Sequence, residues 1–345
     1  MKIVAVGPLW RGSNAGGLFH AMSREGCLIE VVDEFYFISL QTKKKFNKIL
    51  ERFIRPFQVT EYNEAIKKKI NVFKPDVLFV YKGVFVLPST LLYAREQGCK
   101  LALFYPDVSM TNHGSNIPKA IPLYDVIFTT KTFGITDMQK MFGVNNAHFI
   151  RHGFDPDIHR KLNLQAEGKD FNCDVSFIGT YSPKKELWLA SIKKNLPGID
   201  LKIWGEQWSK ATDPVLKDAI QYKAIVGDLY AMAIQSSKIN LGILSEAVFG
   251  SSFGDFITSR TFHIPGSAGF MLHERNAESV LYFEEDKEAG FFDGPEEMVS
   301  KIDFYLTHPD IREKVRDAGY QRALRDHSLD ARAREVIKQL NDILM

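Results

Sequence analysis

The chain has 345 residues, of which 45% are hydrophobic and 25% are charged, and its net charge is +2. This composition excludes a disordered or fibrous chain, and the length predicts two globular domains. No apolar run reaches the roughly 20 residues that cross a bilayer. Three scattered cysteines, Cys27, Cys99 and Cys173, lack metal-ligand spacing. We therefore expect a cytoplasmic protein without structural disulfides.

The charge is divided unevenly along the chain. Residues 1–165 contain 22 Lys and Arg against 14 Asp and Glu, a net charge of +8, whereas the remainder has a net charge of −6. This asymmetry suggests that the first half meets an anionic partner, whether a phosphorylated molecule, nucleic acid or a membrane surface, and a membrane partner would place the protein at the inner face of the membrane. A solvated basic face without a partner is the alternative. We expect no stable nucleic-acid partner.

Strand-like and helical stretches alternate from the start of the chain, a pattern typical of an α/β fold with parallel sheets. Residues 3–6 predict the first strand, glycines follow it, and a helix leads to a second strand over 28–33. Further strands are expected over 77–80, 101–105, 126–129 and 148–150. Together these elements predict a Rossmann-like N-terminal domain over residues 1–160.

A basic stretch over residues 43–57 predicts an amphipathic helix. Its apolar face would carry Phe46, Ile49, Leu50, Phe53 and Ile54, with cations opposite. Such a helix either lies on an anionic membrane or packs its apolar face on the sheet.

A second alternation follows a linker that begins near residue 150 and includes the polar stretch 163–172. It starts at residues 173–180 and predicts strands over 201–204, 239–244, 270–272 and 281–283. We therefore expect a second Rossmann-like domain over 161–325. A charged helix over 326–345 is expected to pack back on the N-terminal domain.

The turn over residues 249–260 leads into a helix that is predicted to begin near Ser259. A diphosphate at this helix terminus would meet free N–H groups, and Arg260 could donate two charge-assisted hydrogen bonds. The alternative is that Ser259 caps the helix and Arg260 is a surface residue.

The segment from Ser259 to Leu272 has a specific continuation. It is followed by residues 283–288 and 295–298, and then by Arg312, Gly319, Arg322, His327 and Arg332. This composite pattern resembles the C-terminal domain of GT-B glycosyltransferases, closest to the CgeB-like group, and it is similar to the family-four-like glycosyl transferases of group 1. The resemblance implies two Rossmann-like domains facing each other across a cleft, with a nucleotide-sugar donor site in the C-terminal half.

The resemblance also implies donor-binding roles for single residues. Gly12 and Ser13 would face the transferred sugar. Gly179 and Thr180 would lie on the first loop of the donor domain. Phosphate contacts are implied for one of Lys184 and Lys185 and for Ser259 and Arg260. The nucleobase pocket would be lined by Trp204, Gly205 and Val226. His263 stands where related domains often carry the Glu that binds ribose, so Glu288 and Glu274 are alternative ribose ligands.

Candidate catalytic residues follow the predicted strand 101–105. Asp107 and His113 could act as the base that deprotonates an acceptor hydroxyl. The alternatives are a turn carboxylate after Pro106 and a solvated loop histidine. The helix terminus and the cations could take the place of a metal ion at the diphosphate, so we expect neither a metal requirement nor another cofactor.

These patterns favour a glycosyltransferase that moves a sugar from a nucleoside-diphosphate sugar to an acceptor not specified by the sequence. The alternatives are a nucleotide-sugar epimerase or hydrolase of the same fold, and a catalytically inactive binding or structural protein. A dinucleotide oxidoreductase fits less well, because the first turn lacks a Gly-x-Gly-x-x-Gly motif even though Asp33 ends the second predicted strand.

Overall fold

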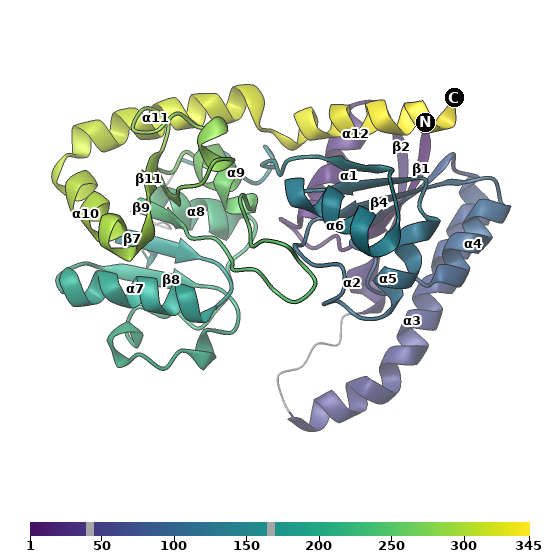
Figure 1. The fold of residues 1–345 in the computed structure, drawn as a ribbon, viewed down its shortest axis with the longest axis horizontal. Coiled ribbons are helices and arrows are strands. Elements are labelled where there is room, and N and C mark those ends of the chain that lie inside the picture. Colours follow the sequence, from purple (N-terminus) through teal and green to yellow (C-terminus); the bar gives the residue numbers. More distant parts are fainter. Residues whose placement is uncertain (39–44, 164–169) are drawn as a thin grey trace. The chain divides into compact units, whose positions relative to one another are not determined.

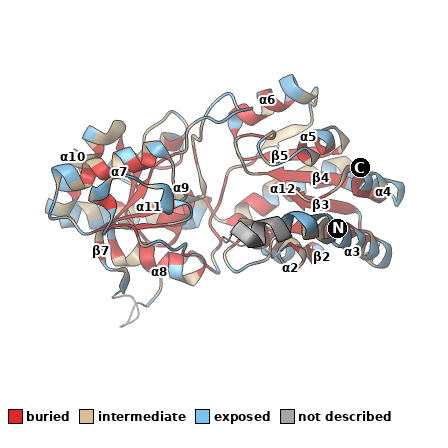
Figure 2. Cartoon of the chain, turned by 90° about the horizontal axis from the view of Figure 1, so that it is seen from below, coloured by how far each residue is buried: buried red, intermediate tan, exposed pale blue. Residues whose placement is uncertain are grey.

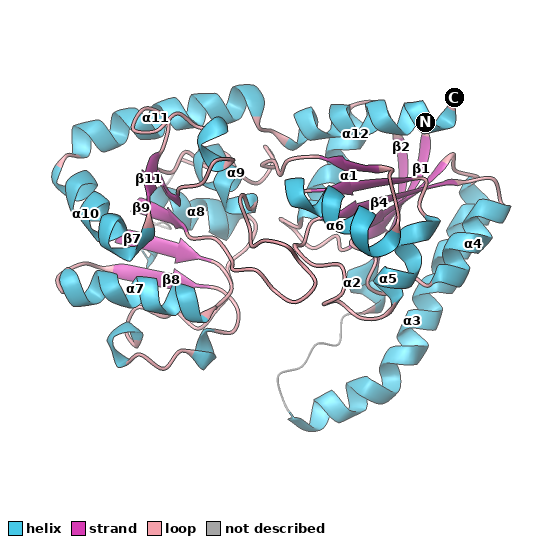
Figure 3. Cartoon of the chain, viewed as in Figure 1, coloured by secondary structure: helices cyan, strands magenta, loops and turns pink. Residues whose placement is uncertain are grey.

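The computed structural model describes residues 1–38, 45–163 and 170–345, with the backbone alone for residues 45–51. Internal contacts divide the chain into two compact units, each built around one parallel sheet (Figures 1 and 3). Unit 1 comprises Met1–Arg151, Ala247–Gly254 and Asp330–Met345, and unit 2 comprises His152–Glu246 and Asp255–Leu329.

The sheet of unit 1 has six parallel strands in the order β2-β1-β3-β4-β5-β6. The strands are β1 (Lys2–Gly7), β2 (Leu28–Asp33), β3 (Val77–Tyr81), β4 (Lys100–Tyr105), β5 (Val126–Thr129) and β6 (Ala147–Phe149). The central strands are strongly apolar and buried, as expected for a sheet covered on both faces (Figure 2). The predicted α/β class and parallel sheets are confirmed.

Helices connect and cover these strands. They are α1 (Asn14–Arg24), α2 (Glu34–Phe37), α3 (Lys45–Phe73), α4 (Pro88–Glu96), α5 (Asn116–Ala120), the 3₁₀ turn η1 (Ile121–Leu123), α6 (Thr132–Phe142) and α12 (Leu329–Leu344). The helix α3 buries Tyr62, Ile66 and Ile70 completely, and their spacing of four residues places them on one helical face.

The first part of α3 does not fit the expectation that its apolar face packs on the sheet. Phe53 is 70% exposed and Phe57 is 77% exposed, so these side chains do not pack on the sheet. The side chains of Phe46, Ile49 and Leu50 lie outside the described part of the chain, as do Lys43 and Lys44.

The sheet of unit 2 has five parallel strands in the order β11-β10-β9-β7-β8. The strands are β7 (Cys173–Ile178), β8 (Leu201–Trp204), β9 (Ser237–Gly242), β10 (Met271–Glu274) and β11 (Gly290–Phe292). The helices are α7 (Pro183–Asn195), α8 (Asp228–Ser236), α9 (Ser259–Gly266), α10 (Gly294–Thr307) and α11 (Pro309–Asp326), with 3₁₀ turns η3 (Trp208–Lys210), η4 (Pro214–Leu216) and η5 (Ser279–Leu281).

The strand predicted over residues 281–283 is wrong. Leu281 ends the turn η5 and is 70% exposed, whereas Tyr282 and Phe283 are buried. Their rings lie 5.7 and 6.3 Å from that of Phe262 on α9, measured between centroids. These aromatic residues anchor a loop beneath α9, and the strand follows later as β11.

The unit boundaries also differ from those predicted, because residues after Arg151 pack with unit 2. The Phe154 N–H donates to the His327 carbonyl at 3.0 Å, and the Leu329 N–H donates to the Phe154 carbonyl at 2.8 Å. Unit 2 therefore begins at His152 rather than at 161. Residues 164–169 of the predicted linker lie outside the described residues.

Helix α12 belongs to unit 1 by its contacts. Asp330 accepts from Arg24 at 2.7 Å, and Ala333, Val336 and Leu340 are fully buried. Within residues 1–38, 45–163 and 170–345, no helix has the length and apolar character needed to span a membrane.

Candidate functional site

The candidate site of unit 2 lies at the carboxyl edge of its sheet. Parallel strands place their carboxyl ends at one edge, which is where ligands bind in folds of this kind. Strands β7, β9 and β10 end there at Ile178, Gly242 and Glu274. Helix α9 begins at Ser259 and its N-cap is Thr258, so Ser259 is the first helical residue and not the cap.

Arg260 packs, half-buried, against the strand ends of this edge. Its Nη2 donates to the Ile243 carbonyl at 2.8 Å, and its guanidinium lies 5.2 Å from the ring centroid of Phe177. Gly179 makes this approach possible, because a Cβ there would lie 2.6 Å from Arg260 Nη1. Desolvation lowers the pKa of Arg260, but a guanidinium stays charged in proteins.

Lys185 is a second cation at this edge, and it is buried. Its Nζ donates to the Ser245 hydroxyl at 2.9 Å and to the Thr180 carbonyl at 3.2 Å. Burial, followed by the charge of Arg260, lowers the pKa of Lys185 to about 8. Among the described residues, neither Lys185 nor Arg260 forms an ion pair with a carboxylate.

Lys184 has a different environment from its neighbour. Its Nζ lies 2.7 and 2.9 Å from the two carboxylate oxygens of Glu274 and stacks over the Trp188 ring. Glu274 also accepts from the Leu244 N–H at 2.9 Å. The charge of Lys184 is therefore already compensated, and Lys185 is the better candidate for binding an anion.

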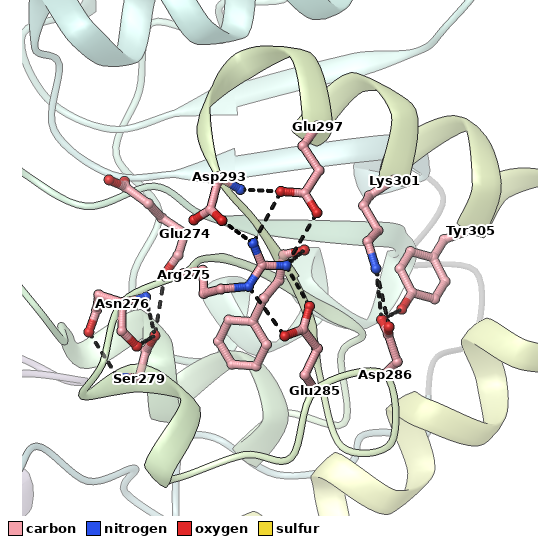
Figure 4. Close-up of polar contacts among 11 residues, drawn as sticks. Glu274, Arg275, Asn276, Ser279, Glu285, Asp286, Asp293, Glu297, Lys301 and Tyr305 are labelled. Atoms are coloured by element: carbon pink, nitrogen blue, oxygen red, sulfur yellow. Dashed lines mark hydrogen bonds and ion pairs between the residues drawn. The ribbon is translucent and has the colours of Figure 1, made fainter.

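The residue after Glu274 fixes this end of β10. Figure 4 shows the Arg275 guanidinium among the carboxylates of Glu285, Asp293 and Glu297. Hydrogen bonds to Glu285, Glu297 and Asp293 raise the pKa of Arg275. This network ties the end of β10 to β11 and α10, and so holds Glu274 opposite Lys184.

His263 lies one turn after Arg260 on α9, and only 7% of it is exposed. Its ring stacks on that of His159 with 3.7 Å between centroids. Burial lowers the pKa of His263 to about 3, so the ring is neutral, and it donates to the Gly153 carbonyl. Its Nε2 has no partner in the described part of the chain, so Nδ1 is the donor and Nε2 holds a lone pair.

The hydroxyl of Tyr230 on α8 is a further buried polar group near His263. The two rings are edge to face with 5.8 Å between centroids, and the Tyr230 hydroxyl has no hydrogen-bond partner among the described residues. Buried polar atoms in native proteins almost always have a partner, so unpaired ones at a ligand-binding edge point to a ligand.

The other predicted residues of unit 2 divide into two groups. Gly179, Thr180 and Gly205 lie at the strand ends of the site, and Val226 is half-exposed just before α8. Trp204 is only 1% exposed and its ring packs near Phe171, which leaves no exposed face for a nucleobase.

Glu288 does not join this site. It precedes β11, at the amino edge of the parallel sheet, and its carboxylate accepts from the Glu284 N–H at 3.0 Å. The structure thus separates Glu288 from Arg260 and keeps Glu274 at the carboxyl edge.

Gly12 and Ser13 lie at the first turn of unit 1. The Ser13 hydroxyl accepts from the Gly16 N–H at 3.0 Å and donates to the Pro8 carbonyl at 2.7 Å. Ser13 is therefore the N-cap of α1, and Gly12 adopts the left-handed φ of 89° that this turn requires.

Asp107 and His113 lie together after β4. Asp107 pairs with Lys82 at 2.7 Å, and His113 Nε2 lies 3.6 Å from the same carboxylate oxygen. The Tyr105 hydroxyl donates to the Ser109 carbonyl at 2.6 Å, so at 3.0 Å it accepts from His113 Nδ1. Burial lowers the pKa of His113, so its Nε2 holds a lone pair that can accept a proton.

Sequence reasoning missed Glu34 and Ser245. Glu34 begins α2 directly after β2, and burial raises its pKa to about 7, although nearby Lys82 opposes the shift. Ser245 follows β9 and contacts Lys185. The available signal was the same for both, a polar residue just beyond the end of a predicted strand.

No group of three or more potential metal ligands occurs in the part of the chain that the structure describes.

Comparisons with known proteins bear on this site. Residues 184–338 match the family described as glycosyl transferase-like. The comparison with curated proteins found no sequence match. A glycosyltransferase from Rickettsia africae ESF-5 is 15% identical, with a TM-score of 0.64 over 99% of this chain and 98% of that one.

Two further solved structures are similar over the whole chain. Anabaena Alr3699/HepE in complex with UDP-glucose is 11% identical, with a TM-score of 0.67 over 99% of this chain and 100% of that one. Sucrose-phosphate synthase from Thermosynechococcus elongatus is 9% identical, with a TM-score of 0.66 over 99% of each chain. The fold is GT-B. The glycosyl transferase-like match includes Lys184, Lys185 and Arg260 of this GT-B protein.

Proposed function

We propose that unit 2 binds the diphosphate of a nucleoside-diphosphate sugar through Arg260 and Lys185. The observation that carries this proposal is the presence at one sheet edge of two cations, one buried and one half-buried, that form no ion pair with a carboxylate among the described residues. Burying a cation without a directly paired carboxylate is costly, and a bound diphosphate would add negative charge to that of the nearby Asp255. The likeness to a protein solved with UDP-glucose supports this donor class.

The same edge offers groups for the ribose. A ribose hydroxyl could donate to Nε2 of His263, which would then act as the acceptor that a carboxylate provides in related domains. The Tyr230 hydroxyl could accept or donate a second bond.

We propose sugar transfer as the reaction. The bond between the anomeric carbon and the diphosphate oxygen breaks, and the acceptor oxygen forms the new bond at that carbon. Arg260 and Lys185 would stabilise the charge that develops on the departing diphosphate. In unit 1, His113 Nε2 would take the acceptor proton, and Asp107 would stabilise the resulting imidazolium.

Donor binding through two side-chain cations would need neither a metal ion nor another cofactor. The expected result is that a chelator such as EDTA leaves turnover unchanged. Loss of turnover with EDTA, restored by added divalent metal, would refute metal independence while leaving the donor site untouched.

The acceptor is proposed to be anionic or membrane-associated, which places the protein in the cytoplasm or at the inner membrane face. Helix α3 has a net charge of +4 by sequence and exposes Phe53 and Phe57 one turn apart. Sedimentation with vesicles of phosphatidylcholine and phosphatidylglycerol is the test. We expect binding to depend on the anionic lipid. Equal amounts of protein in the pellet with and without vesicles would contradict this.

A panel of nucleoside-diphosphate sugars tests the reaction itself. For sugar transfer we expect release of the nucleoside diphosphate to require an acceptor. The rate of this release should fall by about 100-fold in His113→Ala. Release without an acceptor would instead indicate a hydrolase, and conversion of the sugar would indicate an epimerase. Binding without any turnover would indicate an inactive GT-B protein.

A further inference from the structure

The chain between β9 and α9 makes an excursion into unit 1. Residues Ala247–Gly254 belong to unit 1 by their contacts, whereas Glu246 and Asp255 belong to unit 2. The Asp255 N–H donates to the Ser245 carbonyl at 2.9 Å, which closes the base of this loop. Ser245 also contacts Lys185, so the loop starts at the proposed diphosphate site.

The tip of the loop is a tight turn over residues 248–251. The Ser251 hydroxyl donates to the Val248 carbonyl at 2.9 Å and accepts from the Val248 N–H at 3.1 Å. Gly250 has a φ of 78°, in the left-handed region that favours glycine. The turn is therefore held in one conformation by its own residues.

Three sets of contacts fasten the loop to the rest of unit 1. Ser109 Oγ donates to the Phe249 carbonyl at 2.7 Å. The Ser252 N–H donates to the buried carboxylate of Asp137 at 2.9 Å, and the Ser252 hydroxyl bonds the same carboxylate. In addition, the Phe253 ring packs edge to face against Phe133.

Ser109 joins this turn to the candidate base. Its hydroxyl holds the turn, and its carbonyl accepts from the Tyr105 hydroxyl at 2.6 Å and also from the ring of His113. Tyr105 in turn holds His113 Nδ1 at 3.0 Å. One buried serine thus contacts the turn on one side and the groups that set the histidine tautomer on the other.

We propose that the turn over residues 248–251 is a positioning element for His113 and acts through Ser109. This inference rests on the proposed function, in which His113 is the base. The chain segment that starts at the donor site would then also orient the group that activates the acceptor. Phe249, Gly250 and Ser109 are positioning residues in this account, because none of them needs to touch a substrate.

Gly250→Ala tests the proposal. An added Cβ would lie 2.0 Å from Thr111 Oγ1 and 2.9 Å from Ser109 Oγ, so the contact between the turn and the loop that carries His113 must change. Gly294→Ala is the matched control, because Gly294 has a φ of 77° and no atom lies within 4 Å of the place its added methyl group would take. Both variants strain the backbone in the same way, but only the first disturbs Ser109.

The readout is the NMR titration of the His113 ring, which does not depend on activity. Displacement of the loop that carries His113 would expose the imidazole ring to water. We therefore expect Gly250→Ala to raise the pKa of His113 towards its ordinary value. Ser109→Ala, which removes the hydroxyl's bonds to Phe249 and Thr111 but keeps the carbonyl, should shift the pKa in the same direction. The affinity for UDP should stay unchanged in both variants.

An unchanged His113 titration in Gly250→Ala and Ser109→Ala would overturn the proposal. A shift of the same size in Gly294→Ala would overturn it too. If Gly250→Ala fails to fold, as judged by thermal melting, Ser109→Ala alone decides. Failure of both UDP and GDP to bind would refute the donor site and leave the titration result standing, so the two failures are distinguishable.

Discussion

Lys184 and Lys185 are adjacent in sequence but have different electrostatic environments. Lys184 is paired with Glu274, whereas Lys185 is buried beside Arg260 and bonds only neutral oxygens in the described structure. The difference arises because consecutive residues in the first turn of α7 point in directions about 100° apart. Only Lys184 is paired with a carboxylate, so Lys185 is the lysine available to a ligand.

Lys185→Met should have opposite effects on the stability of the fold and on UDP binding. Folding lowers the pKa of Lys185 from 10.5 to about 8, so the folded state disfavours its charged form. This penalty on stability is full below pH 8 and disappears as the pH rises from about 8 to 10.5. We therefore expect Lys185→Met to raise the melting temperature at about pH 7 while weakening UDP binding.

The same shift predicts how UDP binding depends on pH. In the wild type the dissociation constant should rise above about pH 8, because Lys185 loses its proton. In Lys185→Met this dependence should vanish, and in Lys184→Met it should persist. Calorimetry between about pH 7 and 9.5 measures this, and a parallel dependence in all three proteins would contradict the assignment.

His263→Phe tests the ribose contact. Phenylalanine preserves the stack on His159 but removes the Nε2 acceptor. We expect UDP affinity to fall by about 10-fold, which corresponds to the loss of one hydrogen bond. Pyrophosphate, which lacks the ribose, should bind both proteins equally, and a matching loss with pyrophosphate would argue against a ribose contact.

At the scale of elements, the end of β10 depends on one arginine. Arg275→Ala would leave Glu285, Asp293 and Glu297 close together without a cation. We expect a loss of about 2 kcal/mol in the free energy of unfolding, measured with urea. Arg316→Ala, which removes only an exposed pair with Asp317, is the control and should cost less than about 0.5 kcal/mol.

The stability that this ion-pair network contributes is expected to decrease in acid. Hydrogen bonds from Arg275 lower the pKa of Glu297, so its contribution to stability is present near neutral pH and is lost as the pH falls. Arg275→Ala should therefore flatten the acid limb of the stability curve. An unchanged acid limb would contradict the role of this pair.

Much of the element pattern could be predicted from the sequence, because buried parallel strands are continuous apolar runs. The runs that became β1, β3, β4 and β7 are largely buried, and Ser259 does begin a helix. Residues 281–283 were misassigned because a short apolar run can anchor a loop as well as form a strand. The burial of Trp204 was also beyond the pattern, since it depends on packing around the strand.

Most residues of the candidate site could be predicted from the sequence, but not which of its charged side chains form ion pairs. Gly179, Lys185 and Arg260 meet at one sheet edge because each lies near a strand end or helix start. Ser245, which contacts Lys185, and Glu274, which pairs with Lys184, follow or end other strands, and a single sequence does not show which side chains meet. The excursion of Ala247–Gly254 was missed for the same reason.

At the scale of the whole molecule, unit 1 is assembled from three separate chain segments. The last, Asp330–Met345, contributes three fully buried side chains of α12. Deleting residues 330–345 should therefore destabilise unit 1 by about 4 kcal/mol through lost apolar burial. Hydrogen exchange should accelerate in β1 and β3 but not in β7 and β9; equal acceleration in both sheets would contradict this division.

Calorimetric titration with UDP and GDP tests the central claim, that Arg260 and Lys185 form a nucleoside-diphosphate site. We predict that at least one of the two binds, and that Arg260→Ala weakens it by roughly 10- to 100-fold while the fold persists. Arg316→Ala should bind as the wild type does. Absence of binding by either nucleotide, or equal affinity in the wild type and Arg260→Ala, would contradict the account.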